Sequence, residues 1–223
     1  MLTVPVDSSS CTGDRHVART RTRVLYPAAI FVFRVIFKGI FSLKVVSADR
    51  IPADEPLVIV ANHDSFIDGF VVAAAFPDRR LTFLSSSYLF DLPVYGSFLR
   101  AMGALPVQRQ RSNLGSLKTA IEVLKRGGTM AVFPEGGLAR NEILGGAAYL
   151  ALKANATLLP LHITGTKAVL PPGRYWPALA PITVRAGKPV RASELASVTS
   201  ITKNAVMEAT QTLGRVLAEV QEA

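Results

Sequence analysis

Cysteine, acidic residues and long apolar runs are all scarce in this sequence, and each shortage excludes a class of protein. The one cysteine, Cys11, leaves no partner for an internal disulfide and excludes a cysteine-rich metal site. It fits a reducing compartment. Patterns typical of zinc peptidases, P-loop proteins and dinucleotide-binding proteins are missing too, so no metal or nucleotide cofactor is implied.

The shortage of acids predicts an anionic partner. Asp and Glu number 16 against 25 Lys and Arg, which gives a formal net charge of +9 and a pI near 10.1. We do not expect nucleic acid as the partner, because the basic residues are not interleaved with aromatics and no reading motif is present. An anionic membrane surface fits better with the mean hydropathy of +0.32.

The apolar stretch 24–46 is interrupted too often to cross a bilayer, which needs about 20 apolar residues. Arg34, Lys38 and Lys44 break it, four arginines precede it, and it carries Phe31, Phe33, Phe37 and Phe41. This pattern is typical of an amphipathic helix lying in the membrane interface. The alternative is a core helix packed on the sheet. Residues 1–23 are expected to form a basic, disordered tail.

Strand and helix patterns alternate through the rest of the chain, without repeats or linkers. Expected strands are Leu57–Ala61, Leu81–Leu84, Thr129–Phe133, Thr157–Ile163 and Ile182–Ala186. Expected helices are Phe66–Ala75, Asn113–Arg126, Gly146–Ala154 and about Ser200–Glu222. The sequence therefore predicts a single α/β domain with a mostly parallel or mixed sheet flanked by helices, preceded by the interfacial helix.

Two polar blocks each follow an apolar strand pattern. Asn62-His63-Asp64-Ser65-Phe66-Ile67-Asp68 follows one strand, and Phe133-Pro134-Glu135-Gly136 ends another. Because the carboxyl ends of parallel strands carry the sites of α/β proteins, we expect the two blocks to lie side by side.

The spacing of His63 and Asp68 restricts how they can meet. Five residues on a regular helix would turn the two side chains about 140° apart. They meet only if His63 precedes the helix and Asp68 reaches back from its first turns, with Asp64 or Ser65 as the expected N-cap. A carboxylate on one imidazole nitrogen fixes the tautomer and leaves the other nitrogen free as a base. The alternative is a structural, hydrogen-bonded histidine.

These blocks resemble those of the glycerolipid acyltransferase family, the lysophosphatidic acid acyltransferases and their relatives. Asn62-His63 with Asp68 is similar to the family's NHxxxxD (HX4D) block, and Phe133-Pro134-Glu135-Gly136 to its FPEG block. Val107-Gln108-Arg109 resembles the block in which an arginine follows a glycine-bounded strand, and Leu158-Leu159-Pro160-Leu161 the last, proline-bearing strand. The resemblance runs from about Ile51 to Val190, in the family's order.

The resemblance implies transfer of a fatty acyl group from an acyl-CoA or acyl-carrier-protein thioester to a lysophospholipid hydroxyl, in phospholipid synthesis. His63 and Asp68 would be catalytic, in an acyltransferase domain of residues 47–223 that follows a membrane-interface helix of residues 24–46. It also implies a peripheral or monotopic enzyme on the cytoplasmic face of a membrane. No acyl-enzyme is needed, and the sequence has no G-x-S-x-G elbow.

Departures from the family pattern concern the binding of the acceptor. Arg109, Glu135, Gly136 and Arg140 are the expected substrate-binding residues, but Leu138 stands where the family has an arginine, and Ser85-Ser86-Ser87 replace a usual lysine. Arg109 keeps its place, and a guanidinium binds phosphate well. Arg140 is either a substitute for the missing arginine or a surface charge. Two alternatives therefore stay open: an acyltransferase for an aminolipid or glycolipid, and a non-catalytic lipid-binding protein of the same fold.

Overall fold

The computed structural model describes residues 13–108, 114–138, 143–196 and 200–223. Strands in this part of the chain form one seven-stranded sheet, in the order β1-β7-β6-β2-β5-β3-β4. Neighbouring strands are parallel except β6 and β7, so the predicted, mostly parallel sheet is confirmed. The strands are β1 Lys44–Val46, β2 Leu57–Ala61, β3 Leu81–Ser86, β4 Leu105–Val107, β5 Thr129–Val132, β6 Thr157–Thr164 and β7 Thr183–Ala186.

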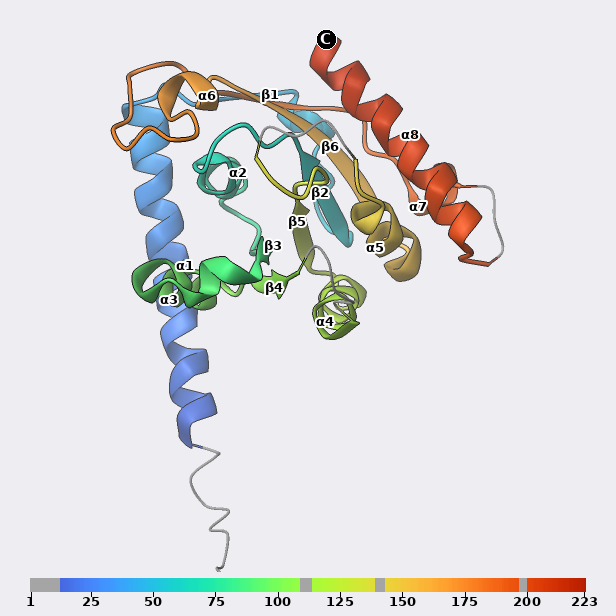
Figure 1. Ribbon diagram of the computed structural model, residues 1–223, viewed down its shortest axis with the longest axis horizontal. Helices are drawn as coiled ribbons and strands as arrows, with labels where there is room; N and C mark the ends of the chain where they lie inside the picture. The colour runs from blue at the N-terminus through green and yellow to red at the C-terminus, as the bar shows by residue number, and fades with distance from the viewer. Residues whose placement is uncertain (1–12, 109–113, 139–142, 197–199) are drawn as a thin grey trace, which may run out of the picture.

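Helices cover both faces of the sheet (Figure 1). On one side lie α1 Gly13–Gly39, α2 Asp68–Ala75 and α3 Pro93–Met102. On the other lie α4 Leu114–Lys125, α5 Gly146–Ala154, α7 Ala192–Leu195 and α8 Lys203–Glu222. Short elements complete the fold: the 3-10 turns η1 Ala48–Arg50 and η2 Ser87–Asp91, and the one-turn helix α6 Thr166–Val169.

Strand β2 shows why the sheet is buried on both faces. Leu57, Ile59 and Ala61 belong to the core shared with α1 and α2, whereas Val58 and Val60 belong to the core shared with α4 and α5. All five residues are buried, as expected for a central parallel strand between two helical layers. The polar residues that follow Ala61 are therefore held at the edge of a rigid, two-sided core.

Helix α1 differs in its bounds from the expected interval 24–46. It spans Gly13–Gly39, so residues 13–23, expected within the tail, are helical. The helix ends at Gly39, Ser42 takes a positive φ of 48°, and Lys44–Val46 then pair with β7 as strand β1. The β-branched pair Val45-Val46 suits this edge strand better than a helix.

The inner face of α1 packs on the domain. Tyr26, Ile30 and Phe37 are buried, and the backbone N–H of Leu81 in β3 donates to the Tyr26 hydroxyl at 2.8 Å. The ring of Phe33 lies 5.0 Å from that of Phe70 in α2. This face is thus a core helix face, the alternative that the sequence left open.

The outer face of α1 is apolar as well. Leu25, Phe31, Val32 and Val35 are about half exposed or more, and a rotation of about 100° per residue places all four within about one third of the helix circumference. This exposed apolar face is compatible with the interfacial helix predicted from the sequence, which stays a prediction. Among the described residues, no helix combines the length and the hydropathy that a bilayer span requires.

Candidate active site

The two polar blocks meet because their strands are neighbours. Strands β2 and β5 are parallel, with Val60 opposite Val132, so their carboxyl ends reach the same edge of the sheet. His63, just after β2, stacks on the ring of Phe133, just after β5, with centroids 4.1 Å apart and planes 14° apart. Residues 62–67, called here the His63 turn, connect β2 to α2.

His63 and Asp68 are in contact, as their spacing predicts. His63 Nδ1 lies 3.0 Å from Asp68 Oδ2, with the histidine ahead of α2 and the aspartate as the first residue of that helix. The side chain of His63 is 19% exposed, while that of Asp68 is fully buried. A carboxylate at Nδ1 selects the tautomer with its proton there, so that Nε2 carries the free lone pair.

Asp68 also shapes the turn that carries the histidine. Its Oδ2 accepts the backbone N–H groups of Asp64 and Ser65, each at 2.8 Å. Its other oxygen, Oδ1, is buried and has no hydrogen-bond partner among the described residues. A single carboxylate oxygen therefore fixes both the ring and the backbone beside it.

The expected helix caps are wrong. The N-cap of α2 is Ile67, which makes no side-chain cap bond. The carboxylate of Asp64 instead accepts from Asn62 Nδ2 at 2.8 Å, and Ser65 Oγ donates to the carbonyl of Leu170 at 2.5 Å. Asp68 instead reaches back from the first turn of α2 to the N–H groups of Asp64 and Ser65, which precede the helix.

Asn62 ties the His63 turn to strand β6. Its Oδ1 accepts from the backbone N–H of Ile163 at 2.7 Å, and its Nδ2 donates to the carbonyl of the same residue at 2.9 Å. The side chain thus bonds to both backbone groups of Ile163, as a paired strand would. These two bonds therefore fix the position of the His63 turn relative to strand β6.

Glu135 lies on the other side of the histidine. The backbone N–H of His63 bonds to its carboxylate, but burial and the nearby charge of Asp64 raise the pKa of Glu135 to about 7. The neighbouring Gly136 has a φ of 63°, and a Cβ there would meet Leu144 Cδ1 at 2.6 Å. This glycine lets the chain turn tightly under Leu144.

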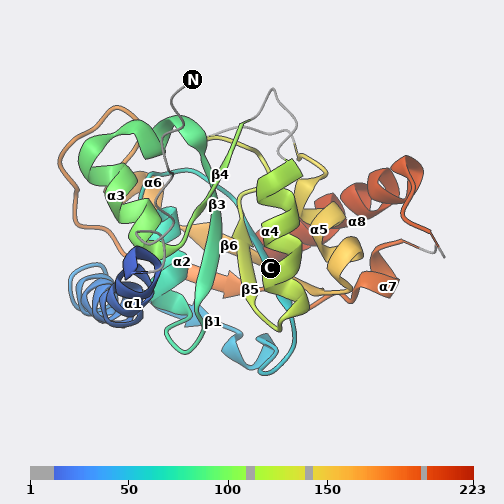
Figure 2. The same cartoon turned by 90° about the horizontal axis from the view of Figure 1, so that it is seen from below.

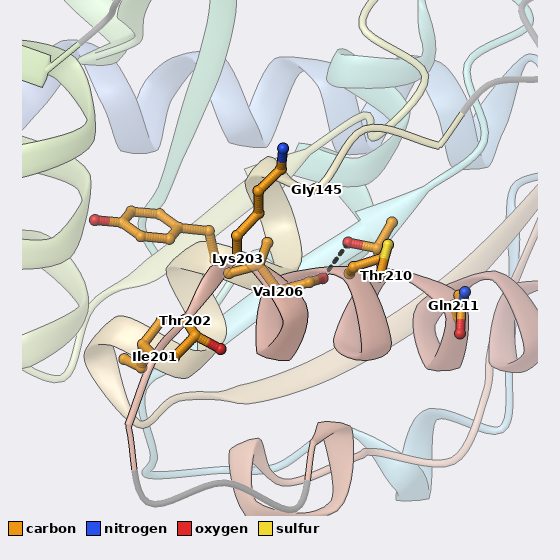
Figure 3. A pocket seen from close by; sticks show the side chains of 9 residues that line it. Gly145, Ile201, Thr202, Lys203, Val206, Thr210 and Gln211 are labelled. Atoms are coloured by element: carbon orange, nitrogen blue, oxygen red, sulfur yellow. Dashed lines mark hydrogen bonds between the residues drawn. The ribbon is translucent and has the colours of Figure 1, made fainter.

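Arg109 and Arg140 lie outside the described residues. Leu138, which stands in place of an arginine, is only partly buried. A groove of about 570 Å³ between α5 and α8, drawn in Figure 3, is lined by residues such as Tyr149, Lys203 and Val206 and includes neither His63 nor Asp68.

The arrangement equips one nitrogen atom for proton transfer. With Nδ1 bound to Asp68, Nε2 of His63 can take a proton from a hydroxyl and return it. The backbone N–H groups of Asp64 and Ser65 are already bound to Asp68, so an oxyanion formed nearby needs other donors.

Reasoning from the sequence missed the supporting contacts. The sequence motifs include Asn62 and Phe133 but do not indicate what these side chains contact, and Ser65 was expected as a helix cap. The polar Asn62 directly after a five-residue buried strand was the available signal, because such a side chain needs a nearby backbone partner. Nothing local could indicate that Ser65 bonds to Leu170, which lies far along the chain.

Comparison with known proteins points to one family. The family model described as Acyltransferase matches residues 42–164, more than half of the chain. The chain is 30% identical over 140 residues to a chloroplast 1-acyl-sn-glycerol-3-phosphate acyltransferase of Arabidopsis thaliana, covering 60% of this chain and 39% of the relative. It is 31% identical over 121 residues to a 1-acyl-sn-glycerol-3-phosphate acyltransferase of Streptococcus pneumoniae, covering 53% of this chain and 46% of the relative.

A solved structure shares the fold. The crystal structure of the 1-acyl-sn-glycerophosphate acyltransferase of Thermotoga maritima superposes with a TM-score of 0.68 at 21% identity, covering 94% of this chain and 88% of that one. In the sequence comparisons, the chain spans less than half the length of the plant and streptococcal relatives.

Proposed function

Because the chain belongs to the acyltransferase family, we propose that it moves a fatty acyl group from a thioester to the free hydroxyl of a lysophospholipid. The names of its relatives make 1-acyl-glycerol-3-phosphate the first acceptor to test, with phosphatidic acid as the product. The donor is acyl-CoA or acyl-carrier protein. This places the protein in phospholipid synthesis.

In this mechanism, Nε2 of His63 removes the proton from the acceptor hydroxyl as its oxygen attacks the thioester carbonyl. The tetrahedral intermediate collapses, the C–S bond breaks, and the imidazolium gives its proton to the departing thiolate. Ester and free thiol are the products, and the enzyme returns to its starting state. Asp68 stabilises the imidazolium and holds the ring, a role that its 3.0 Å contact supports.

One observation carries the proposal: a partly exposed histidine with Nδ1 bound to a buried carboxylate and Nε2 unbonded among the described residues. Phe133 supports the ring from one side. Glu135 bonds to the backbone N–H of His63, which supports a role in positioning the turn, while His63 supplies the base.

We further propose that Arg109 binds the acceptor's phosphate, with Arg140 as a second contact and Gly136 shaping the turn beside it. A guanidinium can bind phosphate with two parallel hydrogen bonds. In Arg109→Ala, the KM for the acceptor should rise at least tenfold while the KM for the thioester stays within twofold. Equal rises in both would exclude this role.

We propose that the protein binds the cytoplasmic face of a membrane as a peripheral or monotopic enzyme, and the outer apolar face of α1 supports the membrane contact. Leu25, Phe31, Val32 and Val35 are exposed there, and Arg34 and Lys38 lie on the same helix. An apolar helix face with basic neighbours is typical of interfacial helices.

The first experiment measures thiol release from a long-chain acyl-CoA, with and without 1-acyl-glycerol-3-phosphate, together with the lipid product by mass spectrometry. We expect acceptor-dependent release in the wild type and a loss of at least a hundredfold in His63→Ala. Acceptor-dependent release that survives in His63→Ala would contradict the mechanism. If the wild type is inactive, acyl-carrier protein and a panel of aminolipid and glycolipid acceptors decide whether the protein is another acyltransferase or a lipid-binding protein.

A further inference from the structure

The loop between α6 and β7 exposes large apolar side chains. Tyr175 is 91% exposed, Trp176 82% and Leu179 80%, the highest values among the large hydrophobic residues that the structure describes. Single exposed apolar residues are common, but three within five positions concentrate exposed apolar side chains on one short loop. Apolar side chains gathered in this way favour contact with another surface.

Charge identifies the kind of surface. The sequence has no Asp or Glu from residue 143 to 193, and Arg174 stands directly beside the two aromatic residues. Lys167 in α6 is exposed as well. Exposed Trp and Tyr side chains favour the headgroup region of a bilayer, and basic residues without acidic neighbours favour an anionic one.

The C-terminal end of this loop is hydrogen-bonded to the segment that follows α1. The backbone N–H of Ile182 donates to the carbonyl of Phe41 at 3.0 Å, and that of Lys44 donates to the carbonyl of Ile182 at 3.0 Å. Figures 1 and 2 both show the loop, in orange, next to the C-terminal end of α1, in blue. The sequence from residue 15 to 48, which includes most of α1, also lacks acidic residues. Two acid-free segments with exposed apolar side chains therefore adjoin.

The loop also begins at a contact with the candidate active site. Leu170, the residue after α6, accepts the hydrogen bond from Ser65 Oγ at 2.5 Å. Ser65 is fully buried, and its backbone N–H is one of the two that hold Asp68. A surface that fixes this loop thus lies one hydrogen bond away from the turn that carries His63.

We propose that residues 171–181, here called the aromatic loop, dock on an anionic phospholipid bilayer with Tyr175 and Trp176 in the headgroup region. Docking there, together with the outer face of α1, sets the His63 turn at the surface that holds the acceptor lipid. The inference rests on the proposed function only in naming the membrane as the source of the acceptor. Its test measures binding and needs no acyl transfer.

Trp176 is the only tryptophan in the chain, so its fluorescence reports this loop alone. The full-length protein is titrated with vesicles of phosphatidylcholine containing phosphatidylglycerol, and separately with phosphatidylcholine alone. We expect a blue shift, quenching by bromine-labelled acyl chains, and weaker binding at high salt or without the anionic lipid. Sedimentation with anionic vesicles while the emission keeps its aqueous wavelength would overturn the proposal, as would no binding at all.

A pair of matched variants separates docking through the aromatic loop from non-specific binding to vesicles. Met207 is 57% exposed on α8, which lies on the opposite side of the sheet in Figure 1. In cosedimentation, Trp176→Ala should lower vesicle partitioning about ten- to a hundredfold, the worth of one large apolar side chain, while Met207→Ala changes it less than twofold. Equal partitioning of both variants would refute the proposed docking of the aromatic loop. Vesicle binding without acyl transfer would instead count against the proposed function alone.

Discussion

Replacing Asp68 by asparagine tests the central pair with little change of shape. The amide oxygen can take the place of Oδ2 and still accept from the backbone N–H groups of Asp64 and Ser65. The amide nitrogen then occupies the position of Oδ1 and brings two donors that lack a partner among the described residues, at a cost of about 1–3 kcal/mol of stability. The variant should still fold, because the bonds to the turn are kept, and its main functional loss is the negative charge beside His63.

The size of the effect follows from the 3.0 Å contact. A unit charge on the imidazolium and one on the carboxylate attract by about 5 kcal/mol at this distance with an effective dielectric constant near 20. Both charges are spread over several atoms and His63 is partly exposed, which weakens the attraction. We therefore expect the Asp68 charge to stabilise the transition state by about 3–4 kcal/mol. This corresponds to a fall in kcat of about 10²–10³.

The assay is acceptor-dependent thiol release in Asp68→Asn, with the melting temperature measured on the same preparation. Asp64→Asn is the matched control: it replaces a neighbouring carboxylate that bonds to Asn62 and not to the histidine side chain. We expect less than a threefold change there. If Asp68→Asn keeps a third or more of the wild-type kcat, or if both variants lose activity equally, the reasoning about the His63–Asp68 pair is wrong.

Two further predictions concern the turn after β5. Burial and Asp64 raise the pKa of Glu135 from 4.5 to about 7, so the folded state binds this proton more tightly than the unfolded chain and the free energy of unfolding falls as pH rises between these values. In Glu135→Gln, the loss of unfolding free energy between pH 5 and pH 8 should be smaller by about 1 kcal/mol, a value reduced for solvent screening. Denaturant unfolding at the two pH values measures this loss. An equal loss in variant and wild type would contradict the raised pKa. Gly136→Ala should cost at least about 1–2 kcal/mol, because its φ is 63° and the new Cβ would meet Leu144. Gly115→Ala, on helix α4 with nothing within 4 Å, should instead stabilise by up to about 1 kcal/mol, and equal melting temperatures for the two variants would refute the strain argument.

The sequence predicts those parts of the fold that depend on local periodicity. Strand β2 is a run of five apolar residues closed by a polar one, and α4 carries leucines and isoleucine at helical spacing; both lie where the patterns predict. The meeting of His63 with Asp68 also follows from local geometry, because the two residues are only five apart. Their catalytic roles stay a prediction.

The contacts that the sequence could not predict are between residues distant along the chain. The bonds of Asn62 to Ile163 and of Ser65 to Leu170 depend on which strands become neighbours, and local patterns do not fix that order. The end of α1 was misjudged for a related reason. Val45 and Val46 are apolar enough for an amphipathic helix, and only their pairing with β7 makes them a strand.

The His63 turn is held from three directions by hydrogen bonds, which bears on how the site can work. Asn62 fastens it to β6, Asp68 fastens it to α2, and Ser65 fastens it to Leu170, the residue directly before the aromatic loop. Attack by a bound hydroxyl requires reacting atoms about 3–3.5 Å apart, a tolerance that a loosely held histidine would not meet. Since the first two bonds join the turn to β6 and α2, they set the position of Nε2 relative to the sheet. The third joins that position to a surface loop, so a membrane that orients the loop also orients the base toward the lipid layer from which the acceptor comes.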